Sequence, residues 1–351
     1  MLTHKFTGKP RKTQRNIAKN PDNLDTLFQK FLEIKKAEGR AERTIKQYIE
    51  NYQYFTEYLD KYNIPRLMSR MNKDIMRGYI VFMQEEIIKY EDHRFVLDKY
   101  KTVGLSPTSI NTRLKTLRVI FNCLRKEHFI EESPMDGVQN VTEPEEEIIV
   151  LTDEELKRLL AVPNKRSFSE FRDYVLMIYL LDGMCRISEA LGLKISDFDY
   201  ATRTVSIPAS IAKNRKARII PVQEQTARLL RELIAENKTD FDSDYIFLTN
   251  YGGPMNPSHF RHRLVKYGKR AGIKKKIHPH LFRHTAATMF LENGGDIRHL
   301  QRLLGHSDLR MVQRYTHLSN KSLIDQHAKY SALNNVMSNL NKPRKIKRAN
   351  I

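Results

Sequence analysis

A break in hydrophobic periodicity between residues 133 and 149 divides this sequence into two parts of different character. The break contains Pro134, Gly137 and Pro144, followed by the acidic run at 145–147. Proline and glycine interrupt both helices and strands, so this stretch is unsuited to a core element. A chain of 351 residues is long enough for two hydrophobic cores. We therefore predict that residues 133–149 form a linker between two domains.

The first part, residues 21–132, has the pattern of a helical domain. Apolar residues recur at spacings of three and four in segments that begin near residues 24, 44, 73 and 108. The polar stretch at 91–105 predicts a loop. Helix starts in this domain carry polar and basic side chains that could contact DNA, although a solvated basic face is the plainer alternative. These candidates are Arg43, Thr44, Lys46, Asn111, Arg113 and Lys115.

The net charge of +20 indicates a polyanionic partner. Double-stranded DNA is favoured because its phosphates attract Lys and Arg. A membrane is disfavoured, since the longest apolar run, 174–181, is too short to span a bilayer. Residues 1–20 predict a basic flexible arm and 337–351 a basic tail. Cys123 and Cys185 form neither a disulfide framework nor a metal motif, which predicts a reducing, cytoplasmic location.

The second part, residues 150–336, has the pattern of a mixed α/β domain. Thr152 and Glu155 predict a capping box at the start of a helix, and 168–182 predicts a central apolar helix. Alternating segments at 203–208 and 217–222 predict an antiparallel strand pair, with a third strand at 245–248. The overall expectation is a mainly α fold with a small antiparallel sheet. Further helices are expected at 257–271, 280–293, 296–304, 308–315 and 319–336.

Four segments of this second domain carry polar residues that a packed core would not favour. The candidate residues are Arg186, Lys213, His280, Arg283, His306 and Tyr315, supported by Glu189 one turn after Arg186. Taken singly, each has an ordinary explanation, such as a surface ion pair or a half-buried tyrosine. His280 and His284, with His278 nearby, could bind a metal, but the motif lacks a carboxylate or cysteine partner. We predict no metal and, because no phosphate-binding glycine motif occurs, no nucleotide cofactor.

Together these residue types suit phosphoryl transfer at a DNA phosphodiester. Arg186 and Arg283 can each present a planar fork to the non-bridging oxygens, and His306 can donate a third hydrogen bond. Tyr315 can then attack the phosphorus and form a covalent intermediate. Two further residues have candidate proton-transfer roles: Lys213 as general acid and His280 as a base for the tyrosine. Lys216 lies in the same turn as Lys213, which we favour for its distance from Pro221.

The set resembles the tyrosine recombinases, also called phage-type integrases. The matching motifs occur in the right order from about residue 151 to residue 317, and the first domain resembles the helical core-binding domain of that family. Cys185 is a departure, since many members carry another small or apolar residue there. The motifs are GMCRISE at 183–189, Lys213 eight residues before Pro221, HLFRH at 280–284, and LGH at 304–306 with Tyr315 nine residues after His306.

The resemblance implies a site-specific recombinase that closes two domains around DNA as a clamp. It implies a 3′-phosphotyrosine intermediate and a homotetramer on two DNA sites, with exchange of the C-terminal helix that follows Ser319. Such an enzyme integrates, excises or resolves a mobile element or replicon, and the 91–105 loop favours a mobile element. Two alternatives are a type IB topoisomerase, which the short first domain disfavours, and a DNA-binding protein without catalysis.

Overall fold

The computed structural model describes residues 21–89, 97–98, 101–144, 148–313, 315, 327–331 and 333. The chain divides into two compact units between residues 145 and 146. Each unit has its own hydrophobic core. None of the described helices combines the length and apolar character needed to cross a membrane.

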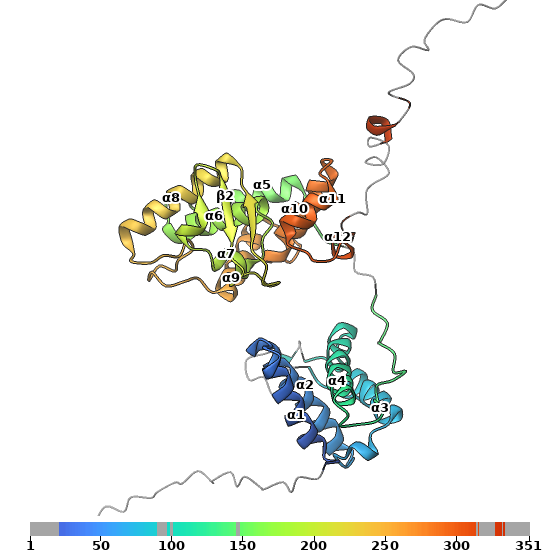
Figure 1. Ribbon diagram of the computed structural model, residues 1–351. Coiled ribbons are helices and arrows are strands. Elements are labelled where there is room, and N and C mark those ends of the chain that lie inside the picture. The colour runs from blue at the N-terminus through green and yellow to red at the C-terminus, as the bar shows by residue number, and fades with distance from the viewer. Residues whose placement is uncertain are drawn as a thin grey trace, which may run out of the picture. The chain divides into compact units, whose positions relative to one another are not determined.

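Among its described residues, the first unit contains four α-helices (Figure 1), and their buried side chains form a core of aliphatic and aromatic residues. Asn23, Asn72 and Ser106 cap the first, third and fourth helices by accepting hydrogen bonds from free backbone N–H groups. In the core, the rings of Phe28 and Tyr52 stack with their centroids 3.8 Å apart. The helices are α1 (Leu24–Ala37), α2 (Glu42–Lys61), α3 (Lys73–Glu85) and α4 (Pro107–Lys126).

Part of the sequence predicted as a linker packs against the first unit. Ser133, Met135 and Val138 are buried, and Met135 and Val138 belong to the first core. Proline and glycine end the helical pattern here, but they do not prevent single apolar side chains from entering a core. At the other end of this stretch, Ile148 packs against a small cluster of the second unit.

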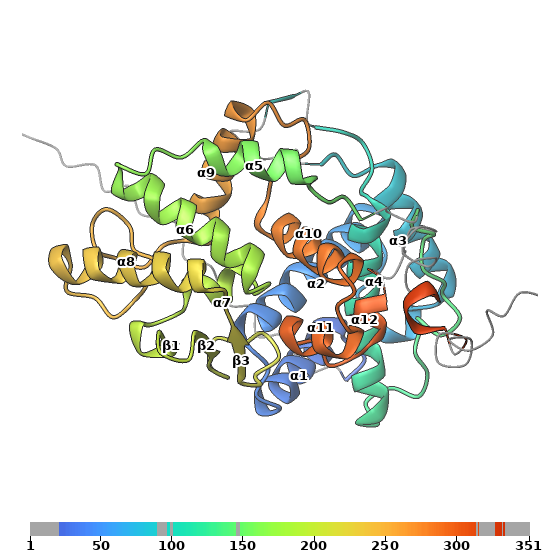
Figure 2. The same cartoon turned by 90° about the horizontal axis from the view of Figure 1, so that it is seen from above.

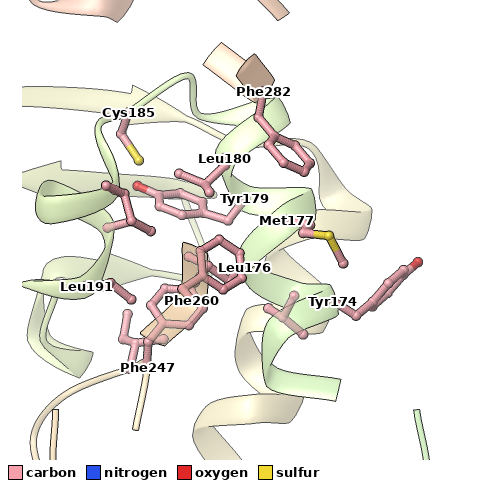
Figure 3. Close-up of a cluster of buried hydrophobic side chains, with 14 of the residues drawn as sticks. Tyr174, Leu176, Met177, Tyr179, Leu180, Cys185, Leu191, Phe247, Phe260 and Phe282 are labelled. Atoms are coloured by element: carbon pink, nitrogen blue, oxygen red, sulfur yellow. The ribbon is translucent and has the colours of Figure 1, made fainter. Parts of the chain in front are cut away.

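The second unit is built around α6 (Phe168–Asp182), against which α8 (Glu224–Asp240) and α10 (Pro279–Glu292) both pack (Figure 2). Figure 3 shows Leu176, Tyr179 and Leu180 of α6 among Phe247, Phe260 and Phe282. The remaining helices are α5 (Asp153–Ala161), α7 (Ile187–Leu191), α9 (Pro257–Arg270), α11 (Ile297–Leu304) and α12 (Arg310–Gln313).

The predicted strand pair is confirmed. β2 (Thr204–Ile207) and β3 (Arg218–Pro221) pair antiparallel, with Val205 opposite Ile220. The third strand of the sheet is β1 (Phe198–Asp199), which pairs with β2. The prediction of a third strand at 245–248 was wrong, since that segment makes only isolated bridges from Tyr245 and Leu248. Its apolar side chains are buried in the core without a neighbouring strand to pair with.

The observed helices agree with the prediction at α5 and differ from it at α8. The capping box of Thr152 and Glu155 is confirmed at the start of α5. Sequence reasoning did not predict α8, although Leu230, Leu233, Ile234 and Asn237 repeat at helical spacing along its buried side. The helix expected at 319–336 lies largely outside the described residues, as do the arm at 1–20 and the tail at 337–351.

Candidate active site

Arg186 occupies the junction between α6 and α7. Gly183 ends α6, where a Cβ would meet the Tyr179 ring at 3.0 Å. Met184 then takes a left-handed backbone conformation (φ 48°), which is unusual for a residue with a side chain. The turn leaves Arg186 as the N-cap of α7 with extended backbone. The sharp change of direction places Arg186 at the start of a helix instead of inside one.

Glu189 fixes the position of Arg186 through two hydrogen bonds. Its carboxylate is fully buried (0 % exposed) and accepts bonds from the Arg186 backbone N–H at 3.0 Å and from Nη1 at 3.1 Å. Arg218 of β3 donates from Nη2 to the same carboxylate at 2.7 Å. Burial alone would raise the pKa of Glu189, but the bonds from Arg218 and Arg186 outweigh it and lower the pKa to about 2. Glu189 is therefore ionised at neutral pH.

Arg218 was absent from the residues predicted from sequence. Besides its bonds to Glu189, it donates from Nε to the Leu303 carbonyl at 3.2 Å. This side chain thus connects the sheet, the start of α7 and the end of α11. The sequence places Arg218 on a predicted strand, three residues before Pro221. It does not show that Arg218 pairs with a buried carboxylate.

Replacing Glu189 with Gln should remove a pH-dependent part of the free energy of unfolding. A carboxyl with a depressed folded-state pKa stabilises the fold above its unfolded pKa of about 4.3, and that stabilisation disappears as the pH falls to 2. We expect about 3 kcal/mol near pH 6. Urea unfolding between pH 6 and pH 2.5 should show the two proteins converging at low pH, with the exposed Glu232→Gln as control. A difference that does not change with pH would contradict this assignment.

Arg283 ties α10 to two other segments. It is 3 % exposed and donates to the carbonyls of Met184 and Leu304, each at 2.7 Å. Its Nη2 also lies 2.9 Å from Nε2 of His306. Burial and the positive charge of Arg186 lower the pKa of Arg283 to about 10, so the guanidinium stays protonated at neutral pH. Arg283 and His306 therefore meet directly, and Arg186 lies close enough to influence the pKa of Arg283.

Gly305 carries the chain from α11 to His306. Its backbone is left-handed (φ 63°), the conformation that favours glycine after a helix. A Cβ here would also lie 3.2 Å from Arg218. The amide of Asn214 donates to the Gly305 carbonyl at 3.1 Å, which fixes the turn between β2 and β3 beside His306. Lys213, the neighbour of Asn214, is exposed in that turn.

Tyr315 follows α12 and is buried, with 5 % of its surface exposed. Its ring belongs to a small apolar cluster with Leu300, Leu304 and Val312. The hydroxyl oxygen lies 2.8 Å from Nδ1 of His284, the residue directly after Arg283 on α10. The structure thus places the tyrosine against the same helix that carries Arg283.

His280 lies at the start of α10, one turn before His284, and the two ring centroids are 6.5 Å apart. The side chain is exposed, yet partial desolvation and the charge of Arg283 lower its pKa. His280 is therefore neutral at physiological pH, in agreement with a role in proton transfer. However, the histidine that contacts the Tyr315 hydroxyl is His284 and not His280. From the sequence, the only role considered for His284 was that of a metal ligand.

The candidate DNA contacts of the first unit differ in their surroundings. Arg43, Lys46 and Lys115 are exposed, and Thr44 is half-buried. Asn111 exchanges two hydrogen bonds with the backbone of Val141, at 2.8 and 2.9 Å. Arg113 stacks on the ring of Tyr54, with its guanidinium carbon 3.7 Å from the ring centroid. These bonds hold Asn111 and Arg113 within the unit, which leaves Arg43, Lys46 and Lys115 as the stronger candidates for phosphate contacts.

A helical unit is followed by a mixed α/β unit that holds a buried arginine (Arg283), a half-buried arginine (Arg186) and a buried tyrosine (Tyr315), and this combination defines a class of DNA strand-cleaving protein. Residues 150–322 match the phage integrase family, and residues 23–141 match the SAM-like domain of phage integrases. The tyrosine recombinase XerC of Bacillus licheniformis is 31 % identical over 311 residues, covering 87 % of this chain and 94 % of that protein. The chain belongs to the phage integrase family of tyrosine recombinases.

Other relatives agree with this assignment. XerC of Bacillus subtilis is 29 % identical over 310 residues, covering 87 % of this chain and 94 % of that protein. Among solved structures, the Tn1549 transposon integrase in complex with a circular intermediate DNA has a similar fold, with a TM-score of 0.66 at 20 % identity over 88 % of this chain and 99 % of that one. XerH site-specific recombinase bound to difH substrate has a TM-score of 0.61 at 20 % identity over 87 % of this chain and 84 % of that one.

Family membership confirms the predicted mainly α fold with a small sheet and the predicted enzyme class. The chain is a site-specific DNA recombinase that breaks and rejoins DNA strands. A topoisomerase or a DNA-binding protein without catalysis is not favoured. The family match does not assign roles to individual side chains, so these roles remain proposals.

Proposed function

We propose that Tyr315 is the nucleophile of this recombinase and that Arg186, Arg283 and His306 bind the phosphate it attacks. The observation that supports this most directly is the contact between Arg283 and His306, with Tyr315 held by the residue next to Arg283. These four side chains come from three segments of the second unit: the α6–α7 junction, α10, and the stretch from His306 to Tyr315. Cationic and hydrogen-bonding groups that surround one phosphate are what the transition state of phosphoryl transfer requires.

In the proposed reaction, the Tyr315 hydroxyl gives its proton to a histidine of α10 and its oxygen forms a bond to phosphorus, while the bond from phosphorus to the 5′ oxygen breaks. The DNA then carries a 3′-phosphotyrosine link, and the leaving 5′ oxygen takes a proton from Lys213. The exposure of Lys213 in the turn that Asn214 anchors beside His306 suits this role. Because the covalent link conserves the energy of the diester, a 5′ hydroxyl of another strand can reverse the step and complete the exchange.

The biological role proposed is the integration, excision or resolution of a mobile element or replicon in the cytoplasm. Two described features support this setting: the charge of +20 for binding DNA, and two buried free cysteines suited to a reducing compartment. The two units would close around duplex DNA as a clamp. The named relatives include both Xer recombinases and a transposon integrase, so the partner DNA must be identified directly.

The decisive experiment captures the covalent intermediate. The purified chain selects its site from a library of DNA fragments, and that site is rebuilt as a duplex with a nick near the cleavage position, so that the cut fragment diffuses away. A denaturant-resistant adduct should form in EDTA, and peptide mapping should locate it at Tyr315. If the chain bound DNA without forming an adduct, the result would favour a DNA-binding protein without catalysis. Relaxation of plasmids that lack the selected site would favour a topoisomerase.

We also propose that the enzyme acts as a homotetramer on two DNA sites, joined by exchange of the segment after Ser319. That segment lies largely outside the described residues, so the proposal follows from the family resemblance. Truncation after His317 should weaken assembly on DNA more than cleavage. Analytical ultracentrifugation of the full and truncated chains on the selected duplex measures the first effect, and adduct yield measures the second. Retention of tetramers by the truncated chain would overturn the exchange.

A further inference from the structure

The reaction described above does not explain why His284 contacts Tyr315. Its Nδ1 lies 2.8 Å from the Tyr315 hydroxyl, and the two ring centroids are 5.6 Å apart. A hydrogen bond of this length to a buried phenol is a specific contact and fixes the direction in which the hydroxyl points. The nucleophile proposed here therefore already has a partner able to take its proton.

We infer that His284 is a catalytic residue that accepts the proton of Tyr315 as the phenol attacks the phosphorus. This inference rests on the proposed role of Tyr315 as nucleophile. In the neutral ring with its hydrogen on Nε2, Nδ1 accepts the phenolic hydrogen bond. As the bond from Tyr315 to phosphorus forms, the proton passes to Nδ1 and leaves an imidazolium. In the reverse step that proton returns to the departing Tyr315 oxygen, so protons balance over a complete strand exchange.

The surroundings of His284 make its position firm. The next residue, Thr285, is fully buried, and its hydroxyl oxygen accepts a hydrogen bond from the Leu151 backbone at 2.9 Å. Ala286 and Ala287 belong to the same apolar cluster as Tyr315. The helix register is thus fixed on both sides of the ring, which is what a proton acceptor needs to be pre-positioned.

His280, the proton acceptor predicted from sequence, is less well placed for this step. It lies one turn earlier on α10, and its side chain is exposed. Among the described residues, the charged and titratable groups near the His284–Tyr315 pair include His280 and Arg283, and Arg283 in turn contacts His306. The structure therefore assigns the phenolic proton to His284, because His284 and not His280 contacts the Tyr315 hydroxyl.

The test measures the rate of adduct formation on the selected nicked duplex. His284→Phe removes the nitrogen, while His284→Asn can retain a hydrogen bond to the phenol but cannot take its proton. We expect both variants to form the adduct about 10²-fold more slowly or worse, the usual effect of losing a general base. The exposed His262→Gln is the matched control.

A second substrate separates the two proton transfers. With sulfur in place of the 5′ bridging oxygen, the leaving thiolate needs no proton, so a Lys213→Ala defect should be relieved while a His284 defect should persist. Normal or faster adduct formation by His284→Asn would overturn the inference, because the hydrogen bond would then only restrain Tyr315. Rescue of His284→Phe by the sulfur substrate would overturn it as well. Failure of the proposed nucleophile is distinguishable, since Tyr315→Phe would then still form an adduct.

Discussion

Tyr315→Phe should abolish the covalent adduct while leaving DNA binding unchanged. The substitution removes only the hydroxyl oxygen that would form the bond to phosphorus. The ring keeps its place in the cluster with Leu304 and Val312, so the fold of the second unit should be retained. Adduct formation is followed by denaturing electrophoresis on the nicked duplex, and binding is followed by mobility shift. Because no other group replaces a missing nucleophile, we expect loss to below detection rather than a reduced rate.

A surface tyrosine provides the control for this result. Tyr251 is almost fully exposed in the turn after residue 248, and Tyr251→Phe should form the adduct at the wild-type rate. An adduct formed by Tyr315→Phe would show that another side chain is the nucleophile. Loss of binding together with the adduct would instead indicate that the hydroxyl has a structural role, through its bond to His284.

The second large effect is expected for Arg283→Lys. Lysine retains the positive charge but lacks the planar fork that reaches Met184, Leu304 and His306 together. We expect adduct formation to slow by about 10²- to 10³-fold, as for the loss of one pre-positioned donor to a transition state. Two buried carbonyls would also lose their donor, which should lower the free energy of unfolding by about 1–3 kcal/mol.

Both effects can be measured on the same protein. Adduct rates are compared well below the melting temperature, where both chains are folded, and urea unfolding supplies the stability difference. The exposed Arg158→Lys on α5 makes the same chemical change outside the site and should alter neither quantity. If Arg283→Lys lost stability but cleaved at the wild-type rate, Arg283 would be structural and another cation would have to bind the phosphate.

The parts of the site that could be predicted from sequence are those in which one short motif fixes both residue type and position. His280 and Arg283 share a helix, and the glycine before His306 marks the end of another. Local spacing is enough for such residues because the helix itself sets their relative positions. The strand pair around Lys213 was predictable for the same reason, from alternation on both sides of a polar turn.

The parts that could not be predicted depend on contacts between segments far apart in the chain. Arg218 and Glu189 are 29 residues apart, and His284 and Tyr315 are 31 apart. Nothing local to either residue marks such a pair, because an arginine on a strand or a second histidine on a helix has many ordinary explanations. The wrong strand prediction at 245–248 has the same cause. A short apolar segment that is buried without a partner strand has the same sequence pattern as a buried strand.

The order of residues on α10 has a consequence for how such an enzyme can be controlled. Arg283 and His284 are consecutive, so their Cα atoms are about 3.8 Å apart across a single peptide unit. The distance between Arg283, which we propose binds the phosphate, and His284, which contacts Tyr315, is therefore fixed by the backbone of α10. Movement between the two units, or between protomers, cannot alter it. Control over cleavage would then act on groups outside this helix, such as the exposed side chain of Lys213 in the turn between β2 and β3.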